Sequence, residues 1–208
     1  MEPTEHNRRA WDEIHRRGAE QLGLPDAVRE RLPDVRGKHV LHVPCGRGEA
    51  TAELGELGAL VTGVDRSADV IAAAQERVPT GAFVVADVHE LPLQLTRGRF
   101  DVAVCGPILD RVGDLDAWAA NLAAALRAGG ALVAYDAHPV ASCVDAASHW
   151  RRDYFGGDGL RFGQIVTAVA GAGLTVRSLD ELPSLHRTQW RRKDPRVPGA
   201  FVLVADKR

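Results

Sequence analysis

A glycine turn followed by an acid is the feature of this chain best suited to chemistry. Gly46 and Gly48 follow the apolar segment 40–43, and Asp65 closes the next apolar segment. Glycine lets the backbone turn sharply and approach a ligand, because it has no side chain. A carboxylate about twenty residues after such a turn accepts hydrogen bonds from both hydroxyls of a ribose. The segment 39–66 therefore predicts one βαβ unit that binds an adenosine-containing cofactor.

These residues resemble the first motifs of the class I S-adenosylmethionine-dependent methyltransferases. The family's first motif reads roughly D/E-x-G-x-G-x-G and matches Gly46 and Gly48, and the acid that ends its second motif matches Asp65. In its third motif an acid and the following backbone amide contact the adenine edge, and they match Asp87 and Val88. The resemblance implies S-adenosylmethionine as the cofactor and S-adenosylhomocysteine as the product.

The resemblance extends from about Asn7 to the C-terminus. FDVAVCG, at 100–106, matches the fourth motif, and AAALRAGGALVAYD matches the following helix, glycine turn and fifth strand. Two residues depart from the pattern. His42 stands where the family usually has an acid that orients the amino-acid end of the cofactor, and Pro44 stands where it usually has the first glycine. A proline is compatible with this turn, since no ladder hydrogen bond is needed after the strand ends.

The glycine pattern argues against a nicotinamide cofactor. The dinucleotide fingerprint needs a third glycine, and Thr51 occupies its position. A sulfonium cofactor has no pyrophosphate, so the shorter turn suffices. Cys45 and Cys105 lie at the ends of expected strands and are expected to face the cofactor cleft. The predicted cofactor-binding residues are His42, Pro44, Cys45, Gly46, Gly48, Asp65, Arg66, Asp87, Val88, Cys105 and Trp11.

Methyl transfer needs few catalytic groups, because alignment and water exclusion can accelerate direct displacement on a sulfonium methyl. An acceptor that must lose a proton also needs a base, and histidine is the usual choice. His138 follows the expected fifth strand, and similar small-molecule methyltransferases often carry a His-Pro pair there. We expect His138 and Asp110 to be catalytic and Arg111 to bind substrate. A loop-bonded histidine and a surface ion pair are the alternatives.

Two later segments could close the pocket. Tyr154 precedes a glycine pair and could supply a phenolic hydrogen bond to an acceptor. Trp190 and Arg192 lie in the basic segment SLHRTQWRRKDPR. This segment could bind a carboxylate or phosphate and stack on an aromatic ring, although such a run is usually a solvated face.

Hydrophobic periodicity places these residues on an alternating α/β framework. Strands are expected at 39–43, 60–65, 82–86, 100–105, 131–135, 174–179 and 200–205. Four helices are expected: one that begins near Glu49, one that Ser67 caps, one over 115–126 and one over 162–172. Gly129 and Gly130 are expected to end the helix over 115–126. The fold class is α/β, a doubly wound, seven-stranded and mostly parallel sheet. The family resemblance implies a Rossmann-like methyltransferase fold with an antiparallel last strand.

The chain is expected to be a single methyltransferase domain, 1–208. Residues 1–36 are mostly polar and cannot form a core of their own, so they predict an N-terminal helical lid over the Rossmann-like core, 37–208. Trp11, in NRRAWDEIH, matches a recurrent aromatic that covers the cofactor in similar enzymes. Its alternative role is to anchor the lid helix.

Composition limits the partners. The 208 residues are 45% hydrophobic, which fits one globular domain, and the net charge of -2 argues against a nucleic-acid binder. The absence of a leader and of an apolar run near twenty residues predicts a cytoplasmic protein without a membrane partner. The three cysteines form no C-x-x-C pair, so reduced thiols and no metal site are expected.

The expected function is S-adenosylmethionine-dependent transfer of a methyl group to an O or N atom of a small molecule. One alternative is a protein of this fold that has altered or lost methyl transfer, which the departures at His42 and Pro44 motivate. Another is a macromolecule methyltransferase, which the near-neutral charge and the sequence CGPILD after the fourth strand disfavour. Either a monomer or a homodimer is compatible with the sequence.

Overall fold

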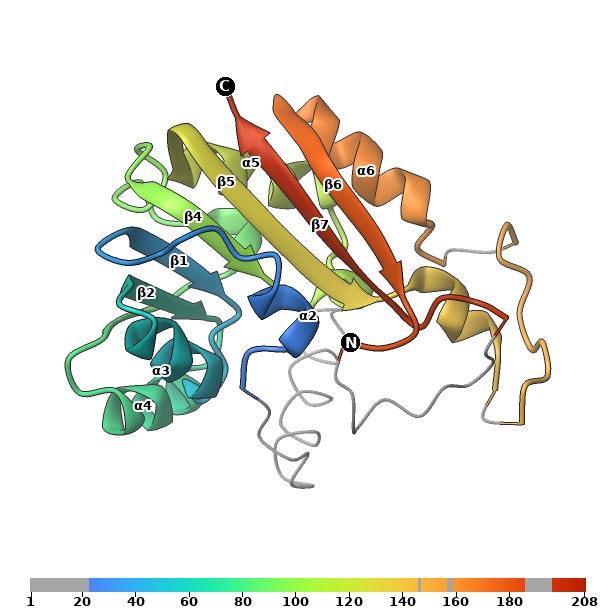
Figure 1. Ribbon diagram of the computed structural model, residues 1–208, viewed down its shortest axis with the longest axis horizontal. Coiled ribbons are helices and arrows are strands. Elements are labelled where there is room, and N and C mark those ends of the chain that lie inside the picture. Colours follow the sequence, from blue (N-terminus) through green and yellow to red (C-terminus); the bar gives the residue numbers. More distant parts are fainter. Residues whose placement is uncertain (1–22, 146, 157–158, 186–195) are drawn as a thin grey trace, which may run out of the picture.

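The protein is described by a computed structural model that covers residues 23–145, 147–156, 159–185 and 196–208 (Figure 1). Its centre is a seven-stranded sheet in the order β3-β2-β1-β4-β5-β7-β6. The strands are β1 His39–Val43, β2 Leu60–Asp65, β3 Ala82–Val85, β4 Phe100–Cys105, β5 Leu126–Ala137, β6 Leu174–Leu182 and β7 Ala200–Lys207. Strands β1 to β5 pair in parallel, and β7 runs antiparallel to both β5 and β6. The predicted doubly wound sheet and its antiparallel last strand are confirmed.

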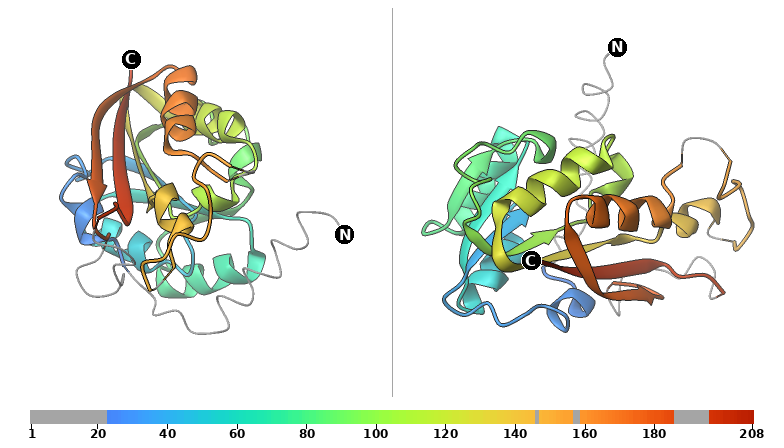
Figure 2. Two further views of the ribbon diagram at one scale, coloured as in Figure 1. Left: turned by 90° about the vertical axis from the view of Figure 1, so that its right-hand side faces the viewer. Right: turned by 90° about the horizontal axis from the view of Figure 1, so that it is seen from above.

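Helices cover both faces of this sheet (Figure 2). They are α2 Asp26–Arg29, α3 Glu49–Glu56, α4 Ala68–Arg77, α5 Leu115–Ala125 and α6 Phe162–Gly171. On one face α5 and α6 bury Trp118, Leu122 and Ile165, and on the other α2 and α3 bury Val28 and Leu54. Trp118 is fully buried, as the helical stripe predicts. Because β1 to β5 are parallel, their carboxyl ends lie at one edge, where the loops form the site.

The prediction for the end of α5 is wrong. The helix ends at Ala125, and β5 begins at Leu126, which pairs with Phe100. Gly129 and Gly130 lie inside the strand, where the pairing with β4 shifts register. A Cβ at Gly130 would lie 3.1 Å from the carbonyl oxygen of Phe100, so this glycine permits the close approach of β4 instead of capping the helix.

The described part of the N-terminal region packs on the sheet. Leu24 and Val28 are buried in the same cluster as Val40, Leu54 and Val202. This segment is therefore anchored to the face that α3 covers. The remainder of the predicted lid, 1–22, lies outside the described residues, as does Trp11. None of the described helices has the length and apolar character that crossing a membrane requires.

Candidate functional site

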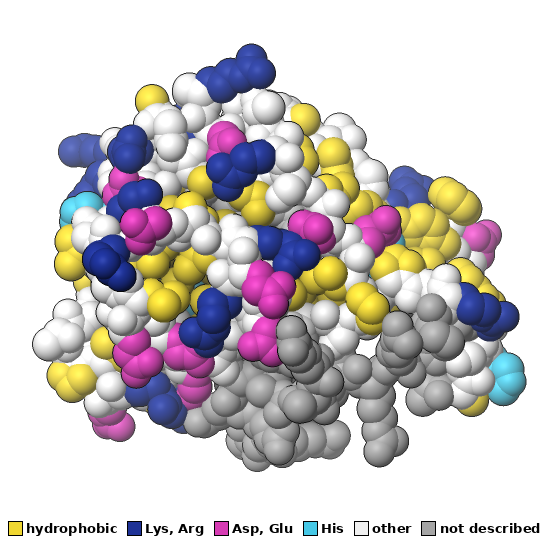
Figure 3. All heavy atoms as spheres, viewed as in Figure 1, with side chains coloured by type: hydrophobic (Ala, Val, Ile, Leu, Met, Phe, Trp, Pro, Cys, Tyr) yellow, Lys and Arg dark blue, Asp and Glu magenta, His cyan; other side chains and the backbone are white. Residues whose placement is uncertain are grey.

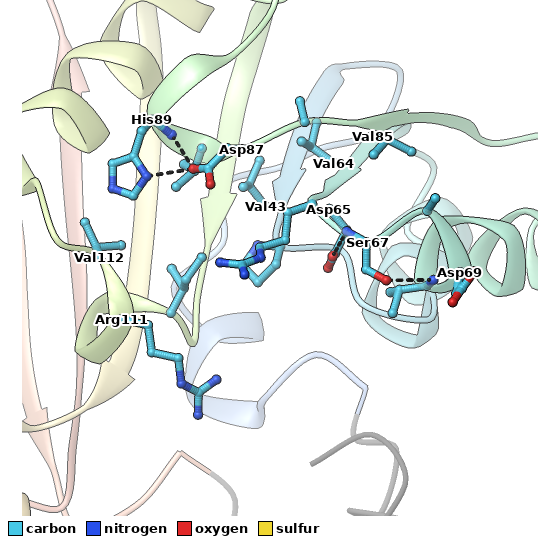
Figure 4. A pocket seen from close by; sticks show the side chains of 17 residues that line it. Val43, Val64, Asp65, Ser67, Asp69, Val85, Asp87, His89, Arg111 and Val112 are labelled. Carbon is cyan, nitrogen blue, oxygen red and sulfur yellow. Dashed lines mark hydrogen bonds and ion pairs between the residues drawn. The ribbon is translucent and has the colours of Figure 1, made fainter. Parts of the chain in front are cut away.

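A cavity of about 430 Å³ opens at the carboxyl ends of β1, β2 and β3 (Figure 4). Its wall includes six of the predicted site residues: Pro44, Asp65, Arg66, Asp87, Val88 and Arg111. Figure 4 shows Arg111 and Val112 on one side of the cavity and Ser67 and Asp69 on the other. The two predicted acids therefore face one space, as the βαβ pattern and the family resemblance require.

Asp65 ties the end of β2 to the glycine turn. Its carboxylate accepts hydrogen bonds from the backbone amides of Gly46, at 3.2 Å, and Ser67, at 3.0 Å. The residue is only 8% exposed. Each amide approaches a different carboxylate oxygen, and an ionised carboxylate has room for about four hydrogen bonds. Asp65 can thus hold the turn and still accept hydrogen bonds from hydroxyls of a ligand.

The two glycines of the turn have different structural roles. Gly46 has a φ of 53°, and a Cβ built there would meet no atom within 4 Å. Gly48 has a φ of 89°, and its Cβ would lie 3.2 Å from the Cα of Ala74 in α4. Gly48 therefore lets the start of α3 approach α4, whereas Gly46 keeps the space beside the turn open. The open backbone at Gly46 lies beside the carboxylate of Asp65, although neither glycine is among the residues that line the cavity.

Asp87 is held in position by a residue that the sequence did not single out, His89. One oxygen of Asp87 accepts hydrogen bonds from the backbone amide of His89, at 2.9 Å, and from its Nδ1, at 2.6 Å (Figure 4). Burial by itself raises the pKa of Asp87, but these hydrogen bonds and the nearby charges of His89 and Arg66 outweigh it, so the pKa is lowered. Asp87 is therefore ionised at neutral pH, with its other oxygen available to a donor such as the amino group of adenine.

A second cavity, of about 570 Å³, adjoins the first along Arg111 and Val112, which line both. Asp110, Arg161 and Gln164 also line it. Asp110 and Arg111 form an ion pair at 3.6 Å, and the side chain of Asp110 is 68% exposed. Two guanidinium groups and one carboxylate thus line a space beside the first cavity.

His42 does not line either cavity. Its side chain is 2% exposed, and its Nδ1 lies 2.8 Å from the hydroxyl oxygen of Thr51, on the first turns of α3. Burial lowers the pKa of His42 to about 4, so the imidazole is neutral at physiological pH. His42 therefore joins β1 to α3, and its direct contact with a cofactor stays a prediction that this geometry does not favour.

Neither predicted cysteine lines the cavities. The expected orientation of Cys105 toward the cleft is wrong, because its sulfur accepts a hydrogen bond from Nε1 of Trp118 inside the core, at 3.3 Å. Cys45 is also buried, and the pKa of each thiol is raised to about 12, chiefly by burial. Both thiols are protonated and unreactive at neutral pH.

The structure also places His138 away from the cavities. The residue is 5% exposed, and its ring packs against Phe162, with ring centroids 4.7 Å apart. Its Nδ1 accepts a hydrogen bond from the backbone amide of Val140, and its Nε2 lies 3.0 Å from a carboxylate oxygen of Glu181. Burial lowers the pKa of His138 more than Glu181 raises it. This arrangement matches the loop-bonded alternative better than a base that faces an acceptor.

Tyr154, another predicted substrate residue, does not line either cavity. The hydroxyl of Tyr154 accepts a hydrogen bond from the backbone amide of Phe162, at 2.8 Å, and so satisfies the first turn of α6. Trp190 and Arg192 lie outside the described residues, so their roles stay predictions. His89, by contrast, follows Asp87 by two residues, and a histidine beside a predicted adenine acid is a signal that could have identified it.

Comparisons with known proteins agree with this geometry. Residues 41–134 match a family described as "Methyltransferase domain". The chain is 34% identical over 107 residues to a ubiquinone biosynthesis O-methyltransferase of Coxiella burnetii, covering 50% of this chain and 45% of that enzyme. It is 36% identical over 104 residues to a trans-aconitate 2-methyltransferase of Paracidovorax citrulli, covering 49% of this chain and 40% of that enzyme. The matches thus span less than half the length of these curated relatives.

The fold has solved counterparts. The crystal structure of an S-adenosylmethionine-dependent methyltransferase from Mesorhizobium loti superposes with a TM-score of 0.74 at 22% identity. The superposition covers 87% of this chain and 96% of that one. The likeness therefore extends well beyond the 41–134 segment.

Proposed function

We propose that this chain, whose residues 41–134 match a methyltransferase domain, is a class I S-adenosylmethionine-dependent methyltransferase. In this proposal it binds S-adenosylmethionine and transfers the methyl group to an O or N atom of a small molecule. The observation that carries the proposal is the placement of Asp65 and Asp87 in the wall of one cavity, at the ends of adjacent strands. Two acids at the ends of adjacent strands can bind the ribose and the adenine of one nucleoside.

Different residues of the cavity would bind different parts of the cofactor. Asp65 would accept hydrogen bonds from the two ribose hydroxyls while it still holds the amide of Gly46. Asp87 would accept a hydrogen bond from the adenine amino group, and the backbone amide of Val88 would donate to the ring. Ile108 and Val112, which line the same cavity, supply apolar surface for the base.

S-adenosylmethionine supplies a methyl group on a positively charged sulfur, which an acceptor lone pair can displace directly. The protein then needs chiefly to align the acceptor and exclude water. The second cavity is the best candidate for the acceptor, because it shares Arg111 and Val112 with the first. Asp110 lines it and is better placed than His138 to contact an acceptor. The printed names of both curated relatives describe methylation of small molecules, which supports this substrate class.

Titration with S-adenosylmethionine and with S-adenosylhomocysteine tests the cofactor half of the proposal. We expect one site per chain with binding by both ligands, and no comparable binding of NAD. Incubation of the enzyme and labelled S-adenosylmethionine with a panel of phenols, carboxylic acids and amines then tests methyl transfer. A protein that binds neither ligand contradicts the proposal.

A second candidate is a protein that binds the same cofactor but does not transfer its methyl group. The observation in its favour is His42, which replaces the usual acid and is bonded to Thr51 instead of facing the cavity. Binding of S-adenosylmethionine without label transfer to any acceptor class would favour this second function. Transfer to one class at rates above the uncatalysed reaction would exclude it.

A further inference from the structure

Asp136 is a buried carboxylate that contacts the loop after β4 and does not line either cavity. It lies near the carboxyl end of β5 and is 5% exposed. One of its oxygens accepts hydrogen bonds from the backbone amides of Ile108, at 2.7 Å, and Leu109, at 2.6 Å. Its other oxygen accepts a hydrogen bond from the amide of Ala137, at 2.6 Å. A single side chain therefore binds two successive amides of a loop 27 residues earlier in the sequence.

The loop held by Asp136 forms one wall of the first cavity, to which we assign the cofactor. Ile108, Arg111 and Val112 all line that cavity. The regular pairing of β4 with β5 ends at Cys105, so beyond it the sheet ladder no longer fixes the chain. Beyond this point the hydrogen bonds from the amides of Ile108 and Leu109 to Asp136 hold the chain, in place of the hydrogen bonds between β4 and β5.

The backbone shows how closely the loop is fitted to β5. A Cβ at Gly106 would lie 1.8 Å from the carbonyl oxygen of Tyr135, so only glycine allows this approach. The Gly106 amide donates to the carbonyl of Val43, at 3.1 Å. The loop thus leaves β4 between β1 and β5, and the Asp136 carboxylate lies where the amides of Ile108 and Leu109 need an acceptor.

We propose that Asp136 is a positioning residue for cofactor binding, because its carboxylate fixes the segment that carries Ile108, Arg111 and Val112 into the cavity wall. Asp136 does not itself touch the ligand in this account. The inference rests on the proposed function in one respect, the identity of the cofactor. Its structural half, the fixing of the loop, can be measured without any ligand.

The burial of Asp136 agrees with such a role. Desolvation raises the pKa of Asp136 to about 6 in spite of its three amide bonds, and the charge of Asp110 adds to the increase. A buried carboxyl group is unfavourable unless it is well hydrogen-bonded. Here one carboxylate oxygen accepts from the amides of Ile108 and Leu109, which lie beyond the end of the β4–β5 ladder.

Two variants separate the acceptor from the charge. Asp136→Asn keeps one oxygen that can accept from both Ile108 and Leu109 and loses only the bond from Ala137, because its NH2 group cannot accept a hydrogen bond. Asp136→Ala removes the acceptor altogether. If the alanine variant does not fold, Asp136→Ser replaces it, because a hydroxyl on the shorter side chain cannot reach both amides. Asp101→Ala is the matched control, because Asp101 lies at the opposite end of β4 from the loop. Its carboxylate accepts a hydrogen bond from the amide of His39, at 2.9 Å, and pairs with Arg127.

The first measurement is hydrogen exchange of the segment 106–113 without ligand, and the second is the Kd for S-adenosylhomocysteine. We expect Asp136→Ala to raise exchange in this segment at least tenfold and to weaken binding at least fivefold, with exchange in β1 to β3 unchanged. Asp136→Asn should keep both values within about threefold of the parent. Asp101→Ala should leave the exchange of 106–113 and the Kd within about twofold.

Three outcomes overturn the inference: unchanged exchange of 106–113 in the alanine variant, faster exchange with unchanged affinity, or equal losses in the asparagine and alanine variants. A parent protein that does not bind S-adenosylhomocysteine contradicts the proposed function instead. In that case the exchange data still decide whether Asp136 fixes the loop.

Discussion

The backbone amide of Gly46 donates a hydrogen bond to the carboxylate of Asp65, at 3.2 Å, and so joins the turn after β1 to the end of β2. The two residues are 19 positions apart in sequence. The ribose acid is therefore also a support for the glycine turn. Any change at Asp65 acts on both, and its effect on ligand binding has to be separated from its effect on the turn.

Replacement of His138 should affect stability more than chemistry. We expect His138→Ala to lower kcat less than fivefold and to leave the pH profile of kcat unchanged, because the ring packs on Phe162 and lines neither cavity. The free energy of unfolding should fall by about 2 kcal/mol, the scale of a lost buried ring and an unpaired amide. A hundredfold loss of kcat together with loss of the pH dependence would instead identify His138 as the base.

Restoring the family's acid at position 42 should destabilise the protein. His42→Asp would place a carboxylate in a site that is 2% exposed, with the Thr51 hydroxyl as its neighbour. We expect the free energy of unfolding to fall by about 2 to 4 kcal/mol at pH 7. Urea unfolding measures this. Unchanged stability together with tighter binding of S-adenosylmethionine would show that position 42 reaches the cofactor.

His42 should also make stability depend on pH. Its pKa is about 4 in the folded protein and 6.5 as the ordinary value, so the unfolded chain binds the proton more tightly. The contribution of the neutral His42 to the free energy of unfolding is therefore fully present above pH 6.5 and is lost as the pH falls toward 4. Between pH 7 and pH 5 the parent should lose about 2 kcal/mol more stability than His42→Asn, which does not titrate. Parallel curves for the two proteins would contradict a neutral buried His42.

The pair of Asp87 and His89 should contribute to recognition of adenine. We expect Asp87→Ala to weaken the binding of S-adenosylhomocysteine by about 1.5 to 3 kcal/mol, the scale of one hydrogen bond to a charged group. His89→Ala should weaken it less, because it removes only the Nδ1 contact that orients Asp87. Calorimetric titration of both variants checks the order. A larger loss for His89→Ala than for Asp87→Ala would mean that the imidazole itself contacts the ligand.

Much of the fold could be predicted because its signals are local. The apolar runs of β1, β2 and β4 are short and end at glycine, proline or acidic residues, and their observed bounds agree with the prediction. Asp65 is the last residue of β2, and Asp87 lies two residues after the end of β3, so both acids could be placed from the ends of strands. The end of α5 was missed because Gly130, which together with Gly129 favours a helix C-terminus, instead permits the close approach of β4 to β5.

The rest of the site depends on contacts that no local pattern encodes. Asp136 meets the amides of Ile108 and Leu109 only after β4 and β5 have paired. His138 turns away from the cavities because Phe162 and Glu181, from later elements, surround it. The register of the strands predicts which residues reach an edge of the sheet, but it does not predict toward which neighbour each side chain points. On the surface, too, hydrophobic, basic and acidic side chains are intermixed over one face of the molecule (Figure 3).

The most direct test of the central claim is the affinity of the parent and of Asp65→Ala for S-adenosylmethionine, measured by titration at pH 7. We expect the variant to lose about 2 to 3 kcal/mol of binding free energy, the scale of charge-assisted hydrogen bonds to two hydroxyls. Asp65→Asn keeps one acceptor oxygen for Gly46 and shows how much of the loss belongs to the turn, and thermal unfolding confirms that each variant is folded. Equal affinity of the parent and a folded Asp65→Ala would contradict the ribose site and the account built on it.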